Sequence, residues 1–270
     1  MGIDEFFANL WSDYVASTPQ AEKIKQAFEA KGERVVNDHV AFRTLALEPI
    51  RLKALEPHLL AVGYTPYEPY DFAAKKLSAY GYLPPEPDMP RVFLSELRVD
   101  ELSDASAKIL RGLAEQVDAE RVKDPSILWS GRLWDPVSWE DYQTLLAESE
   151  YAAWVATIGI RPNHFTIAVN YLEQHAGVEE VLQTVEGLGY KVNDSGGRVK
   201  GSPDVLLEQG STLADRMMAP FADGQEREVP TCYYEFAKRY PTPSGELYPG
   251  FVAQSADKIF ESTNVAKSGS

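Results

Sequence analysis

The chain has 270 residues, of which 44% are hydrophobic and 25% charged, as in a globular protein with a sizeable core. Its 26 basic and 41 acidic residues give a formal net charge of −15, which argues against nucleic acid or an anionic membrane as a partner. The single cysteine excludes an intramolecular disulfide and a thiolate zinc site, so we expect a protein of the reducing cytoplasm. No apolar run approaches the ~20 residues that a helix needs to span a bilayer.

The first hundred residues predict helices followed by strands. Residues 1–32 have apolar positions at helical spacing, broken by Ser-Thr-Pro, which predicts two short helices. A strand is expected at about 34–45 and a helix at 49–62, which ends at a glycine. The alternating pattern RVFLSELRV predicts a further strand at Arg91–Val99.

The rest of the chain continues with helices and then returns to strands. The amphipathic pattern from Asp104 to Lys123 predicts one helix, with Asp104 as its N-cap. A tryptophan-rich connector and another helix follow it. Strands and a helix resume between Arg161 and Arg239, and a polar tail ends the chain.

Two parts of the chain resemble each other. The strand NDHVAFRTL contains His39, and the strand PNHFTIAVN contains His164. At nearly the same spacing each is followed by a helix, a Gly-Tyr pair and further strands. The last strand of each part carries a glutamate, Glu96 in the first and Glu235 in the second. We interpret this pattern as a duplicated βαβββ unit, in which Glu96 is the equivalent of Glu235.

The histidines and a glutamate of the repeat are candidate metal ligands. Side chains alternate between the two faces of a strand, so His39 and Arg43 share one face. His164 takes the same place in the second unit, and Tyr233 and Glu235 share a face of the last strand. Two imidazoles and one carboxylate on one side of a metal leave about three positions open, as in the facial triad of non-haem Fe(II) oxygenases.

The repeat predicts an α+β fold in which two βαβββ modules form one curved, half-open barrel, with helices added before and between them. We expect a single metalloenzyme domain over residues 1–270. Its parts are the N-terminal helices at 1–32, the first module at 33–100, a helical connector at 101–158, the second module at 159–240 and a C-terminal segment at 241–270.

Five short segments also resemble a known family in their order and spacing. They are NDHVAFRTL, FLSELRVDELS, PNHFTIAVN, YYEFAKR and GFVAQSADKIFEST, and the likeness covers about residues 34–265. The chain resembles the DUF1338 family, that of 2-oxoadipate dioxygenase/decarboxylase (2-hydroxyglutarate synthase) of lysine degradation. This family lies within the glyoxalase-like, vicinal-oxygen-chelate superfamily, so the resemblance implies a glyoxalase-like half-barrel.

The resemblance assigns roles to particular residues. It implies that His39, His164 and Glu235 hold Fe(II), although Ni, Co, Zn or Mn can occupy such a site in a purified sample. It implies that Arg43 binds a substrate carboxylate, to which a guanidinium is suited through paired hydrogen bonds. Ser255 is our candidate for a distal substrate contact. The implied reaction converts 2-oxoadipate and O₂ to 2-hydroxyglutarate and CO₂.

Several alternatives stay open at this point. Glu96 is either a fourth ligand or base, or a supporting group that pairs with Arg98, and Tyr233 is a further candidate near the metal. The chain could also be a redox-neutral glyoxalase- or epimerase-like metal enzyme, or a metal-free module that binds a small molecule. His58 and His175 are expected on the surface, and a homodimer is compatible with the sequence.

Overall fold

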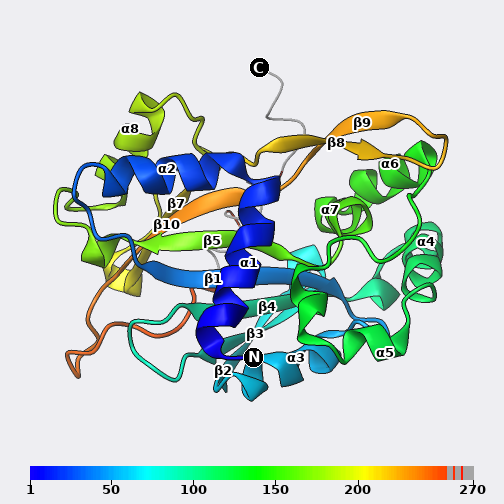
Figure 1. Ribbon diagram of the computed structural model, residues 1–270, viewed down its shortest axis with the longest axis horizontal. Helices are drawn as coiled ribbons and strands as arrows, with labels where there is room; N and C mark the ends of the chain where they lie inside the picture. The colour runs from blue at the N-terminus through cyan, green and yellow to red at the C-terminus, as the bar shows by residue number, and fades with distance from the viewer. Residues whose placement is uncertain (254–257, 259–262, 264–270) are drawn as a thin grey trace.

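The computed structural model describes residues 1–253, 258 and 263. An eight-stranded mixed sheet curls into a half-barrel, with strand order β2-β3-β4-β1-β5-β10-β7-β6 (Figure 1). Its strands are β1 (Asn37–Leu45), β2 (Thr65–Phe72), β3 (Leu77–Leu83), β4 (Arg91–Leu97), β5 (Pro162–Ala168), β6 (Lys200–Ser202), β7 (Leu207–Ser211) and β10 (Tyr233–Arg239). The predicted α+β half-barrel is confirmed.

The sheet consists of two similar modules that meet at its centre. The first runs β1-α3-β2-β3-β4, with α3 at Leu52–Ala61, and the second runs β5-α8-β6-β7-β10, with α8 at Val178–Gly187. In each module the first and last strands pair in parallel, and β1 and β5 pair antiparallel across the module boundary. The second module also carries a hairpin, β8 (Arg216–Pro220) and β9 (Glu226–Pro230), that the sequence pattern did not predict.

The N-terminal helices cover one face of the sheet (Figure 1). They are α1 (Ile3–Ser17) and α2 (Pro19–Glu29). The ring centroids of Trp11 and Tyr14 lie 5.1 and 5.0 Å from that of Phe165 in β5. The Tyr14 hydroxyl donates a 2.5 Å hydrogen bond to the carbonyl of Tyr233 in β10. Because neighbouring residues of a strand point to opposite faces, covering Phe165 leaves His164 on the inner face.

The segment between the two modules consists of helices, and the long helix predicted from Asp104 to Lys123 is divided. Its elements are α4 (Asp104–Ala114), α5 (Ala119–Val122), the 3-10 helix η3 (Pro125–Trp129), α6 (Trp139–Glu148) and α7 (Glu150–Ile158). The Asp118 carboxylate accepts a hydrogen bond from the amide of Glu120 and so begins a new helix. Ser103, not Asp104, caps α4, because its hydroxyl accepts from the amide of Ser106.

Two histidines that we expected on the surface are buried. His58 lies in α3, and its Nε2 is 2.7 Å from the carbonyl oxygen of Val122. His175 lies between Glu33 and Thr184, with both ring nitrogens 2.8 Å from a side-chain oxygen of these partners. The contacts with Val122 and Glu33 join segments far apart in the chain, which local sequence patterns do not reveal. Within the described ranges, every helix is too short or too polar to cross a bilayer.

Substituting two glycines is expected to have opposite effects on stability. Gly159 ends α7 at φ +82°, and a Cβ there would lie 2.2 Å from the Gly131 carbonyl oxygen. Gly159→Ala should therefore lower the free energy of unfolding by about 2–4 kcal/mol. Gly112 lies in α4 with nothing within 4 Å of an added Cβ, so Gly112→Ala should raise it by about 0.5–1 kcal/mol. Urea denaturation measures both, and equal effects would contradict this account.

Candidate metal centre

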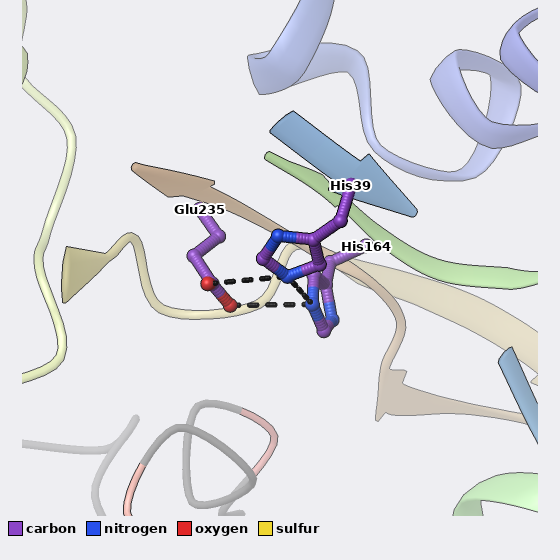
Figure 2. Close-up of side chains that lie close together, drawn as sticks. All are labelled: His39, His164 and Glu235. Atoms are coloured by element: carbon purple, nitrogen blue, oxygen red, sulfur yellow. Dashed lines mark hydrogen bonds and ion pairs between the residues drawn. The ribbon is translucent and has the colours of Figure 1, made fainter. Parts of the chain in front are cut away.

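Three buried side chains converge on the inner face of the half-barrel (Figure 2). They come from three adjacent strands: His39 from β1, His164 from β5 and Glu235 from β10. The two Nε2 atoms are 3.4 Å apart, and the Glu235 carboxylate oxygens lie 3.4 Å from His39 Nε2 and 3.2 Å from His164 Nε2. Their exposed fractions are 2%, 4% and 0%, so bulk water does not reach between them.

The register of the strands brings these residues together. On β5, Thr166 lies opposite His39 on one side and opposite Glu235 on the other. His164 is two residues earlier on the same face of β5, and its neighbour on β1 is Ala41. The three candidate ligands therefore occupy two neighbouring rows across the sheet, where side chains are close enough to share one ion.

A neighbouring side chain orients each imidazole. His39 Nδ1 is 2.7 Å from a carboxylate oxygen of Asp38, and His164 Nδ1 is 3.1 Å from the amide oxygen of Asn163. Because both oxygens accept, each Nδ1 carries the proton and donates. The Nε2 atoms then carry lone pairs that face each other and the carboxylate of Glu235, and the Thr166 hydroxyl lies 3.1 Å from His39 Nε2. Imidazoles that ligate metals are held in the same way.

The electrostatics of the cluster favour a cation at its centre. Burial raises the pKa of Glu235, although His39 and the 2.7 Å hydrogen bond from Gln209 Nε2 oppose that shift. Burial, together with His39 and Arg43, moves the pKa of His164 well below its usual value. Within the described part of the chain, Glu235 Oε2 has no hydrogen-bond donor. Two unprotonated nitrogens and one such oxygen form a donor set that fits a divalent metal.

Asp38 is itself held by a buried arginine that the sequence analysis missed. Arg239 Nε and Nη2 donate to its two carboxylate oxygens at 2.7 and 2.9 Å. Burial alone would raise the pKa of Asp38, but the Arg239 charge and the His39 hydrogen bond place it well below the usual range. Arg239 also donates to the carbonyls of Tyr248 and Gly250. The sequence signal for this pair was that Asp38 and Arg239 are charged residues within two strands rich in apolar residues, which also carry the candidate ligands His39 and Glu235.

Arg43 lies on the inner face of β1 and is buried. Its guanidinium carbon is 5.1 Å from the ring centroids of both Tyr151 and Trp154 in α7, and Nη1 is 3.4 Å from the hydroxyl of Thr263. Its charge partly opposes the large rise that burial causes in the pKa of Tyr233. The arrangement places a permanent cation, flanked by aromatic rings, on the same face as the three candidate ligands.

The structure places Glu96 and Arg98 away from this cluster. Glu96 lies on the other face of β4, where its carboxylate accepts a 2.8 Å hydrogen bond from the amide of Leu52 at the start of α3. Arg98 pairs with Asp71 and Glu101, at 2.6 Å in both cases. The predicted pairing of Glu96 with Arg98 is therefore wrong, because the two residues have different partners on different elements.

The remaining predicted site residues have different outcomes. The ring of Tyr233 stacks on that of His164, with centroids 4.6 Å apart. Ser255 lies outside the described residues. Phe251, from the same C-terminal segment and not predicted, places its ring centroid 4.9 Å from that of His39 and 4.8 Å from that of Phe93. The inner face next to His39 is therefore aromatic.

Comparison with known proteins identifies relatives that match nearly the whole chain. The family model described as 2-oxoadipate dioxygenase/decarboxylase matches residues 7–125 and 126–248. The 2-oxoadipate dioxygenase/decarboxylase of Oryza sativa subsp. japonica, named chloroplastic/amyloplastic, is 36% identical, over 97% of this chain and 80% of the relative.

Solved structures share the fold, and one of them is a hydroxyglutarate synthase. The hydroxyglutarate synthase of Oryza sativa in complex with 2-oxoadipate has a TM-score of 0.93 and 34% identity, and the match covers 98% of this chain and 93% of that one. A Shewanella frigidimarina protein named only as a candidate hydrolase has a TM-score of 0.88 and 47% identity, over 93% and 97%. A Ralstonia eutropha protein of the glyoxalase superfamily, 24% identical over 90% and 83%, shares the fold with a TM-score of 0.73. The chain belongs to the 2-oxoadipate dioxygenase/decarboxylase family.

Proposed function

We propose that this protein is a metal-dependent dioxygenase/decarboxylase that converts 2-oxoadipate and O₂ to 2-hydroxyglutarate and CO₂, a step of lysine degradation. The observation that carries the proposal is the buried cluster of His39, His164 and Glu235, in a chain of this family. One ligand atom from each residue lies within 4.8 Å of the others.

In this proposal His39, His164 and Glu235 hold Fe(II). Two neutral imidazoles and one carboxylate suit non-haem iron, and the same donors would accept Ni, Co, Zn or Mn in a purified sample. When bound, the metal supplies the Lewis acidity and the one-electron chemistry that reactions of O₂ require. The protein fixes its ligands through Asp38 and Asn163 and keeps bulk water away.

Arg43 is proposed to bind a carboxylate of the substrate. Its rigid, planar guanidinium matches a carboxylate, and the buried setting between Tyr151 and Trp154 strengthens the attraction relative to water. Tyr233 is proposed as a wall of the same site, and Ser255 as a distal contact. A reducing compartment such as the cytoplasm is compatible with the buried free thiol of Cys232.

The redox-neutral alternative loses its main support. A glyoxalase- or epimerase-like site would need a second carboxylate beside Glu235, and Glu96 was the candidate for this fourth ligand or base. Glu96 instead caps α3 on the opposite face of the sheet, so it does not reach the cluster.

The proposed reaction is tested by loading the protein with Fe(II) without oxygen and then adding O₂ and a 2-oxo acid. We expect 2-oxoadipate to consume one O₂ and release one CO₂ for each 2-hydroxyglutarate formed. Pyruvate, which lacks the second carboxylate, should react far more slowly. Release of CO₂ without consumption of O₂, or no turnover of any 2-oxo acid, would contradict the proposal.

Asp38→Asn is expected to weaken metal binding by about 10–100-fold, because the His39 ring loses the carboxylate that fixes its tautomer and orientation. Competition with a chromophoric chelator measures this affinity, and circular dichroism checks the fold. Asp223→Asn is the matched control, since this exposed carboxylate lies at the surface and pairs with Arg227, four residues along the chain. An Asp38→Asn protein that folds and keeps the wild-type affinity would refute the role of Asp38.

A further inference from the structure

The two modules are related by an approximate two-fold axis that the strand register makes explicit. Where β1 and β5 pair, His39 lies opposite Thr166, and Ala41 lies opposite His164. Exchanging the two strands therefore exchanges His39 with His164 and Ala41 with Thr166. His39, Val40 and Ala41 of β1 then each have one equivalent on β5.

The same two-fold relation, applied to the last strands β4 and β10 of the modules, identifies the first-module equivalent of Glu235. Thr166 lies opposite Glu235 on β10, and its counterpart Ala41 lies opposite Phe93 on β4. Phe93 therefore occupies the first-module position that Glu235 occupies in the second. The sequence pattern had suggested Glu96 instead, but Glu96 is an odd number of residues away and faces the other side.

The next strands show the same replacement of polar by apolar groups. On β7, Gln209 lies opposite Ala237 and donates the hydrogen bond that orients Glu235. By the same pairing in the first module, Ala79 on β3 lies opposite Ser95 on β4 and takes the place of Gln209. The second module thus supplies a carboxylate and the amide that positions it, whereas the first supplies a phenyl ring and a methyl group.

Phe93 is buried within an aromatic wall beside His39. Its ring centroid lies 4.8 Å from that of Phe251, whose centroid is 4.9 Å from that of His39. Tyr70 closes the wall, with its centroid 5.4 Å from that of Phe93. A Cβ added to Gly81, which lies opposite Phe93 on β3, would be 3.3 Å from the Tyr70 ring, so the packing here is close.

We propose that Phe93 determines the number of protein ligands at this centre, an inference that rests on the proposed metal triad. An apolar ring in the position equivalent to Glu235 withholds a fourth protein ligand. The 2-oxo acid and O₂ would then meet no competing carboxylate ligand from the first module. The apolar rings of Phe93 and Phe251 also offer competing water no hydrogen-bond partner there. By keeping a fourth protein ligand from the metal, Phe93 favours the oxidative reaction over redox-neutral chemistry at this site.

The test restores a ligand at this position in the full chain. Phe93→Glu, and Phe93→His as a second variant with a smaller desolvation cost, should bind Co(II) at least about tenfold more tightly than the wild type. Their visible Co(II) spectra should no longer respond to 2-oxoadipate without oxygen, whereas the wild-type spectrum responds. Met218→Glu adds the same charge on the exposed strand β8 and should leave both readings unchanged.

The possible results separate this inference from the proposed function. If the Phe93 variants fold but bind Co(II) with the wild-type affinity and still respond to 2-oxoadipate, the role of Phe93 is refuted while the metal triad stands. If the wild-type protein does not bind Co(II), the triad fails and the inference fails with it.

Discussion

Replacing Glu235 by glutamine is expected to abolish stoichiometric metal binding and to lower turnover of 2-oxoadipate by at least about 10³-fold. Glu235 is the only anion among the three candidate ligands, and it is fully buried. Glutamine keeps the volume of the side chain and a partner for Gln209, so the change removes charge and leaves packing intact. Metal content after anaerobic dialysis and O₂ uptake measure the two effects.

Glu96→Gln is the matched control for this change. Glu96 belongs to the same sheet and was an alternative candidate ligand from the sequence, but it caps α3 on the opposite face. Its substitution should leave metal content and turnover unchanged and lower the free energy of unfolding by about 1 kcal/mol. If Glu96→Gln lost metal and Glu235→Gln kept it, the assignment of the carboxylate ligand would be reversed.

Replacing Arg43 by alanine is expected to leave the metal in place and to raise the KM for 2-oxoadipate by about 100-fold, equivalent to about 2.7 kcal/mol. The guanidinium lies on the same face as the triad but is not one of its ligands. Arg43→Lys should recover only part of this loss, because an ammonium lacks the planar pair of donors. Initial rates at varied substrate concentration, with metal content measured in parallel, give the result.

A surface arginine provides the control for Arg43. Arg198 pairs with Glu179 and Glu186 at the surface, and Arg198→Ala should change neither KM nor metal content. Because Arg43 is buried between aromatic rings, its variants also require a check of folding by circular dichroism. A folded Arg43→Ala protein with the wild-type KM would show that the substrate carboxylate binds elsewhere.

The sequence predicted the first strands of the two modules well, for a physical reason. Because side chains alternate along a strand, His39 and Arg43 must share a face. The duplicated pattern predicts that His164 occupies the position of His39 in the second module. The identity of the carboxylate was harder, because it depends on which residue of the last strand lies opposite Thr166. That register is set by pairing between strands far apart in the chain.

Other features depend on tertiary contacts that local patterns do not contain. His175 is buried because Glu33, far earlier in the chain, accepts a hydrogen bond from its ring. Asp38 and Arg239 are unremarkable charges in the sequence, yet together they support the ring of His39. The hairpin of β8 and β9 lacks the apolar–polar alternation of an expected strand pair, although Asp223-Gly224 between the strands is a turn signal. These are features that long-range packing decides.

The most direct test is a crystal structure of the Fe(II)-loaded protein, with anomalous diffraction recorded at the iron edge. We predict one strong peak per chain, about 2.0–2.2 Å from His39 Nε2, His164 Nε2 and a carboxylate oxygen of Glu235. Addition of 2-oxoadipate without oxygen should place the substrate on the side that faces Phe93, with a carboxylate against Arg43. A peak at any other set of side chains, or no peak between these three, would contradict the account.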